Sequence, residues 1–236
     1  SHALPAARYG AADLRARLAS LATAEDAARL ELALSRALAT YAGDMAAGVL
    51  KPRAIDREIH VDVERPSPRD ALNAAAVAPD LGAWLASLAP PDPGYDRLRA
   101  LYARLLAEER SGGWRATLGE GGTLRLGDRD PRVERLRERL AELGDPAPVA
   151  PEPALFDDAL EATVKAFQRR HGLNDDGIVG RRTFGALGAD AGERVRQVAV
   201  NLERLRWGPD LTAPRRIEAN IPDFSMRFVD GERVLH

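Results

Sequence analysis

The fold of this chain is decided by residues 124–140, which read LRLGDRDPRVERLRERL. Asp130 is well placed to cap a helix N-terminus, and Pro131 suits the first helical position because its backbone angle is already fixed there. Apolar side chains then recur every three or four residues, at Val133, Leu136, Leu140 and Leu143. Gly144 ends the pattern, since glycine readily adopts the conformation that follows a helix. The stretch therefore predicts an amphipathic helix with one buried face.

Two shorter helices are predicted downstream. Residues 145–153 contain four prolines, which cannot continue a helix, so they form an exposed connection. Asp157 caps a second helix that Gly172 ends, and the turn Asn174-Asp-Asp-Gly177 leads into a third. The apolar side of these two helices consists of Leu160, Val164, Phe167, Phe184 and Leu187. The three helices predict one small domain at residues 119–188.

Residues 1–118 are predicted to form a helical scaffold domain. The chain is 45% apolar but only 5% aromatic, which favours packed helices over a β-sandwich. Helical spacing runs from Ala11 to about Ala47 with a break near Thr23, and again from Tyr95 to about Arg110. Between them, residues 55–63 look extended, and Ser67-Pro68 starts a new helix. No polar cluster interrupts the apolar faces, so core packing explains them.

The last part of the chain changes character. A linking helix is predicted within residues 189–212, after which Ile217 to Ile221 and Ser225 to Val229 alternate as strands do. Asp230-Gly231 is a typical hairpin turn. Because an isolated hairpin is marginally stable in water, residues 213–236 are expected to be the first strands of an incomplete β-domain. The predicted fold class is mainly α, with a helical bundle, a small three-helix domain and a C-terminal β-hairpin.

Charge and composition exclude several functions. The 34 basic and 36 acidic residues give a net charge of −2, which argues against a nucleic-acid partner. The absence of cysteine excludes disulfides and a thiolate nucleophile. The four histidines, His2, His60, His171 and His236, have no metal-ligand spacing, so neither a metal nor another cofactor is expected.

The N-terminus shows neither a signal peptide nor a membrane span, because no stretch approaches the ~20 apolar residues that a span requires. Ser1-His2 resembles an expression-vector remnant. We therefore expect that an export signal has been removed.

Three segments carry a resemblance to a known family. Residues 124–140, the stretch Ala162-Thr-Val-Lys-Ala-Phe-Gln-Arg-Arg-His-Gly-Leu173 and the stretch Asp176-Gly-Ile-Val-Gly-Arg-Arg-Thr183 are similar to the peptidoglycan-binding domain of cell-wall enzymes. Further on, residues 194–207 and Asn220-Ile-Pro222 resemble the passage into the catalytic domain of the large murein L,D-transpeptidases. Residues 38–48 and 95–105 resemble the helical scaffold of the same family.

This resemblance implies the peptidoglycan-binding and scaffold portion of an L,D-transpeptidase, truncated before its catalytic cysteine. Such enzymes make 3-3 crosslinks by cysteine acyl transfer between stem peptides, in the periplasm or cell envelope. This chain has no cysteine and therefore no expected catalytic residue, and His236 cannot act as a base without a nucleophile. Its expected partner is the glycan or stem peptide of peptidoglycan.

The candidate peptidoglycan-binding residues lie at the end of the second helix, in the turn and at the start of the third helix, which the turn should bring together. They are Gln168, Arg169, Arg170, Asp176, Arg181 and Arg182. Arginine forks and side-chain amides suit the hydroxyl, amide and carboxylate groups of peptidoglycan. A solvated helix face remains the alternative for Arg169 and Arg170, and a turn-forming role for Asp176.

Two other functions stay open. The chain is alternatively a docking scaffold for other cell-wall synthesis enzymes, or the targeting region of a zinc-dependent peptidoglycan hydrolase, because the same binding domain accompanies such enzymes. Retention on isolated sacculi would separate the binding function from the docking function. The residues beyond His236 would separate the two enzyme classes.

Overall fold

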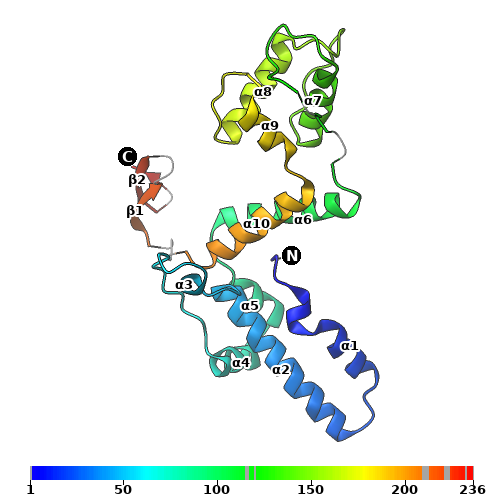
Figure 1. Cartoon of the computed structure of the whole chain (residues 1–236). Helices are drawn as coiled ribbons and strands as arrows, with labels where there is room; N and C mark the ends of the chain where they lie inside the picture. The colour runs from blue at the N-terminus through cyan, green and yellow to red at the C-terminus, as the bar shows by residue number, and fades with distance from the viewer. Residues whose placement is uncertain are drawn as a thin grey trace. The chain divides into compact units, whose positions relative to one another are not determined.

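The computed structural model describes residues 2–114, 117–119, 121–208, 213–220, 224–231 and 233–235. Within them the chain is mainly helical and ends in a small antiparallel sheet, as the sequence predicted (Figure 1). It divides into two compact units, one of Ser1–Tyr102 with Val198–His236 and the other of Ala103–Gln197. The division falls within helices α6 (Pro93–Arg110) and α10 (Ala191–Leu205), so each of these helices contributes to both units.

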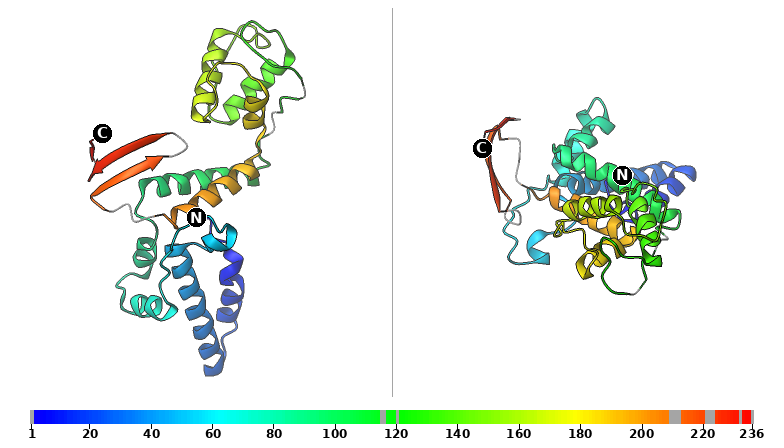
Figure 2. Two further views of the ribbon diagram at one scale, coloured as in Figure 1. Left: turned by 60° about the vertical axis from the view of Figure 1, so that its left-hand side comes forward. Right: turned by 90° about the horizontal axis from the view of Figure 1, so that it is seen from above.

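The first unit is built around helix α2 (Ala24–Ala47), which packs against α1 (Ala11–Ala19) and α4 (Pro68–Val77). Figures 1 and 2 show α1 and α2 as neighbouring antiparallel helices. Thr23 caps α2 through a reciprocal box with Asp26, and Gly48 ends it, so both predicted boundaries are confirmed. The remaining helical elements of this unit are η1 (Ala6–Tyr9), α3 (Pro52–Ile55) and α5 (Leu81–Ser87).

The expected extended segment at 55–63 is only partly correct. Ile55 closes helix α3, because Pro52 at the first helical position starts a helical turn. Residues 59–66 form no helix and belong to no strand of the described chain. Ser67 then caps α4 and Pro68 opens it, as predicted.

A buried carboxylate ties the first unit together. Asp44 on α2 is completely buried and accepts hydrogen bonds from Arg8 Nε at 2.7 Å, Tyr9 Oη at 2.9 Å and Arg65 Nη1 at 2.8 Å. Burial and the hydrogen bond to Asp44 raise the pKa of Tyr9, so its hydroxyl stays protonated and continues to donate. One side chain thus joins η1, α2 and the segment that precedes α4.

The second unit contains the predicted three-helix domain, formed by α7 (Pro131–Glu142), α8 (Asp158–Arg170) and α9 (Arg181–Gly188). The Asp130 side chain caps α7, and that of Asp157 caps α8. One apolar cluster fills the interior and includes Leu124, Val133, Leu136, Leu140, Phe156, Leu160, Val164, Phe167, Val179 and Leu187. Leu124 and Val179 also exchange two backbone hydrogen bonds, which join the entry of the domain to the segment before α9.

The C-terminal sheet has the order β1-β2-β3, with β1 (Arg215–Asn220), β2 (Ser225–Asp230) and β3 (Arg233–Val234) antiparallel. The predicted hairpin at Asp230-Gly231 is present, with Gly231 in the left-handed region at φ 61°. Ile217 pairs with Phe228 on one face, and both side chains are exposed. The predicted strand end at Ile221, and His236, lie outside the described residues. That the sheet begins a larger β-domain remains a prediction.

Candidate functional site

The turn between α8 and α9 is organised by Gln168. This side chain, 1% exposed, lies at the end of α8, where its amide nitrogen donates to the Ile178 carbonyl at 2.9 Å. The same nitrogen lies 3.2 Å from both Asp176 Oδ1 and Thr183 Oγ1. Its oxygen accepts the Gly177 N–H at 2.9 Å. The predicted binding residue Gln168 therefore uses its polar atoms to hold the turn against two helices.

Asp176 shapes the same turn from its exposed side. Its carboxylate accepts the N–H of Ile178 at 2.8 Å and the side-chain amide of Asn174 at 2.9 Å. The bond from Ile178 is the main cause that lowers the pKa of Asp176, so the group is ionised at neutral pH. Gly177 follows at φ 78°, and a Cβ there would lie 2.6 Å from the Glu161 side chain. The turn thus requires glycine for conformation and for space.

The two arginines at the end of α8 are engaged in ion pairs. Arg169 Nη1 lies 3.2 Å from Asp175 Oδ2, and both side chains are exposed. Both terminal nitrogens of Arg170 contact the carboxylate of Asp145, which lies in the connection between α7 and α8. An exposed pair contributes little to stability, whereas the forked Arg170 contact holds that connection in place.

Arg181 and Arg182 are the first two residues of α9, and both are exposed. They differ from Arg169 and Arg170 in their polar contacts. Neither guanidinium has an ion pair or side-chain hydrogen bond within the described part of the chain. They line a hollow of about 240 Å³ together with Gln168 and Asp176. The structure therefore brings four of the six predicted residues to one hollow, whereas Arg169 and Arg170 do not line it.

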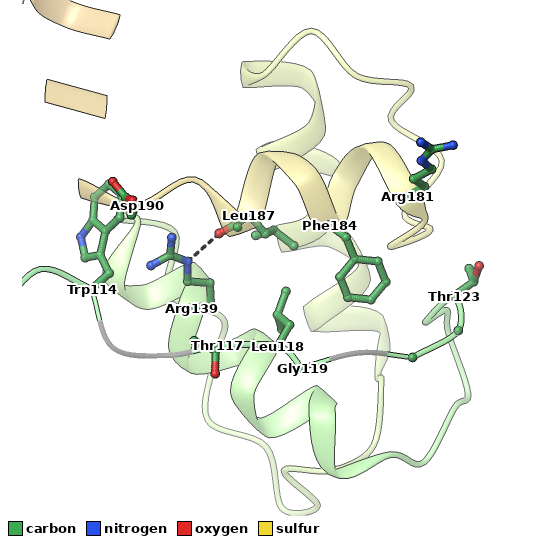
Figure 3. A pocket seen from close by; sticks show the side chains of 13 residues that line it. Trp114, Thr117, Leu118, Gly119, Thr123, Arg139, Arg181, Phe184, Leu187 and Asp190 are labelled. Atoms are coloured by element: carbon green, nitrogen blue, oxygen red, sulfur yellow. Dashed lines mark hydrogen bonds between the residues drawn. The ribbon is translucent and has the colours of Figure 1, made fainter. Parts of the chain in front are cut away.

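A larger cavity, of about 1010 Å³, borders α9 and was not predicted from the sequence. Figure 3 shows Trp114 and Asp190 at one end and Arg181 with Thr123 at the other. Phe184 lies between these ends. Arg181 lines both this cavity and the smaller hollow. The sequence offered one sign of this cavity. Trp114 is an aromatic residue that follows the polar stretch Ser111-Gly-Gly113, and helical periodicity does not assign it to a core.

Arg139 forms part of the cavity wall, and each of its three guanidinium nitrogens already donates to a protein group. It is buried, donating from Nε to the Leu187 carbonyl and from Nη2 to the Ala189 carbonyl, both at 2.7 Å. Its Nη1 reaches Glu142 at 3.1 Å, and the guanidinium lies 4.7 Å from the centre of the Trp114 ring. A cation satisfying the last carbonyls of a helix is favourable, so Arg139 fixes the end of α9 to α7.

No group of three or more acidic or histidine side chains within the described ranges could hold a metal ion. His171 lies against Phe167, with ring centres 4.1 Å apart. Burial, followed by the nearby Arg194 and Arg170, lowers the pKa of His171, so the ring is neutral at pH 7.

Comparison with known families gives two matches. Residues 1–101 match the family described as a scaffold domain, and residues 129–187 match the family described as a putative peptidoglycan-binding domain. No curated protein matches the chain. The chain thus carries a scaffold-like region followed by a peptidoglycan-binding region, an order consistent with part of a cell-wall enzyme. No helix of the described residues is long and apolar enough to cross a membrane.

Proposed function

We propose that residues 119–188 hold this protein on peptidoglycan in the cell envelope. The observation that carries the proposal is the peptidoglycan-binding match at 129–187. It includes Arg181 and Arg182 at the start of α9, which are unpaired within the described part of the chain. The domain has 11 basic and 13 acidic residues, so bulk attraction to an anionic polymer is not the mechanism. Local hydrogen bonds from a few placed groups must provide the affinity.

The six predicted site residues take different roles in this proposal. Arg181 and Arg182 donate to peptidoglycan, because their guanidinium groups are exposed and unpaired within the described residues. Gln168 and Asp176 hold the turn that presents them. Arg169 and Arg170 flank this surface. Each would have to break its ion pair, with Asp175 or Asp145, before it could bind a ligand group.

Sedimentation with isolated sacculi tests the binding proposal. The double variant Arg181→Gln/Arg182→Gln should bind at least about tenfold more weakly, since a hydrogen bond to a charged group contributes about 1.5–3 kcal/mol. The matched control is Arg125→Gln/Arg129→Gln, which removes the same charge from the same domain. Arg125 and Arg129 are both exposed. Within the described residues, the ion pair that this control removes is the surface contact of Arg129 with Glu152.

Equal loss in both double variants would show general charge dependence and contradict the assigned roles. Failure of the unaltered protein to pellet, while a partner enzyme retains it, would favour the docking-scaffold function instead.

We further propose that the chain is the scaffold and binding part of an L,D-transpeptidase. The order of the two family matches supports this, together with the resemblance of residues 194–222 to the passage into such a catalytic domain. In this proposal the scaffold covers 1–118, the linking helix lies within 189–212, and 213–236 begins the catalytic domain. The chain itself lacks the cysteine that would attack a stem-peptide amide.

The reading frame of the parent gene tests this assignment. A Ser/Thr-His-Gly-Cys stretch after residue 236, and formation of 3-3 crosslinks that a Cys→Ala variant abolishes, are the expected results. Histidine and aspartate at zinc-ligand spacing would identify a hydrolase instead.

A further inference from the structure

The large cavity beside α9 has charged side chains at its two ends, and their arrangement bears on which part of peptidoglycan would bind there. Its middle is apolar, with Leu118, Phe184 and Leu187 in the lining. Arg181 lies at one end and Asp190 at the other (Figure 3). Arg139 also lines the cavity, but its guanidinium is bound to Leu187, Ala189 and Glu142. Among the described lining residues, opposite charges therefore remain available at opposite ends.

Both end groups are able to meet a ligand. Arg181 is exposed and extends outward from α9 in Figure 3, and exposed side chains change rotamer within nanoseconds, so it can turn toward a bound molecule. Asp190 is exposed as well, and its Oδ1 accepts the N–H of Glu193 at 2.6 Å. That cap uses one carboxylate oxygen, and an ionised carboxylate has further acceptor directions.

Helix α9 gives the scale of the cavity, because Arg181 begins this helix and Asp190 lies two residues beyond its end. Arg181 and Gly188 are the first and last residues of α9, so the helix is about 12 Å long at 1.5 Å per residue. An extended peptide rises about 3.3–3.6 Å per residue, so three or four residues cover that distance. Glycines 119, 121, 122 and 188 also line the cavity, where they allow the ligand to approach the backbone closely.

We propose that this cavity binds a short zwitterionic peptide, which in peptidoglycan is the stem peptide. A carboxylate of the peptide pairs with Arg181, its free amine pairs with Asp190, and its small side chains lie on Phe184 and Leu118. The glycan strand lacks a free amine and would leave Asp190 without a cationic partner. The inference rests on the proposed peptidoglycan binding and names which part of the polymer is recognised.

The test pairs changes in the protein with changes in a soluble stem tetrapeptide carrying a free amine and a free carboxylate. Arg181→Gln and Asp190→Asn should each weaken binding of this peptide about tenfold by calorimetry. Asparagine caps a helix as well as aspartate does, so the second variant keeps the start of α10. Arg125→Gln and Asp158→Asn are the charge-matched controls, since both side chains are exposed outside the cavity, and they should leave affinity unchanged.

Ligand variants make the assignment specific. Amidating the peptide carboxylate should weaken binding to the unaltered protein but not to the Arg181→Gln variant. Acetylating the peptide amine should weaken binding to the unaltered protein but not to the Asp190→Asn variant. If the losses of binding free energy from the protein change and the matching ligand change simply add, the proposed pairs of Arg181 with the carboxylate and of Asp190 with the amine are wrong. Equal competition by a disaccharide without peptide would show that the cavity takes glycan. If the unaltered protein pellets with sacculi but has no affinity for the tetrapeptide, this inference alone is refuted. If the unaltered protein does not pellet with sacculi, the proposed function itself is refuted.

Discussion

Replacing Asp44 with alanine is expected to lower the free energy of unfolding of the first unit by about 3 kcal/mol. The carboxylate is completely buried and accepts from Arg8, Tyr9 and Arg65. Removing one partner of a buried ionic cluster costs about 3–5 kcal/mol. The lower end applies here, because the Arg8 and Arg65 side chains are 42% and 41% exposed and regain water when the carboxylate is lost.

Urea unfolding followed by far-UV circular dichroism measures this effect. Asp62→Ala is the matched control, since Asp62 is 90% exposed and forms a surface pair with Arg53 at 3.2 Å. Its loss should cost less than about 1 kcal/mol. Similar destabilisation by the two variants would show that the buried cluster contributes no more than a surface pair.

Replacing Gln168 with leucine is expected to destabilise the three-helix domain by about 2–3 kcal/mol. Leucine fills similar space but leaves the buried N–H of Gly177 without its acceptor. It also removes the donor to the Ile178 carbonyl, Asp176 and Thr183. A buried group that loses its only partner carries its full desolvation cost, which is why the effect exceeds that of an ordinary hydrogen bond.

Arg169→Leu is the control for this prediction, because Arg169 is the next residue of α8 and 59% exposed. It should change stability by no more than about 0.5 kcal/mol. Sacculus binding of Gln168→Leu, measured where the domain is still folded, then separates the two roles of this residue. A Gln168→Leu variant as stable as the unaltered domain would contradict the positioning role, because the turn would then hold without the amide.

The local elements of the fold were predictable because their signals are local. Asp130-Pro131 and Asp157 start α7 and α8 where capping chemistry requires, and the apolar spacing predicted which side chains are buried. The segment at 55–63 was less well predicted, since its β-branched residues favour an extended strand but Pro52 directs its start into a helical turn. Tertiary pairing, which is absent from the local pattern, decides whether an extended segment becomes a strand.

The candidate site was predictable only in part. The turn at 174–177 brings Gln168 and Asp176 to the same hollow as Arg181 and Arg182, as their positions around the turn predicted, whereas Arg169 and Arg170 do not line it. The roles of these residues could not be predicted, because the same polar side chain serves equally well in a turn or at a ligand. A structural role in the turn can be distinguished from a ligand contact only when hydrogen-bond partners are seen within about 3 Å of the side chain.

The sequence by itself determined a mainly helical chain, a three-helix domain at the peptidoglycan-binding match and the absence of a cysteine nucleophile. These features depend on residue identity and on spacings of a few residues. The tertiary structure alone decided that Gln168 is internal, that Arg181 is unpaired within the described residues, and that a cavity lies beside α9. Such features join residues distant in the chain, as when Arg139 on α7 binds the carbonyl of Leu187, so they exist only once the helices have packed.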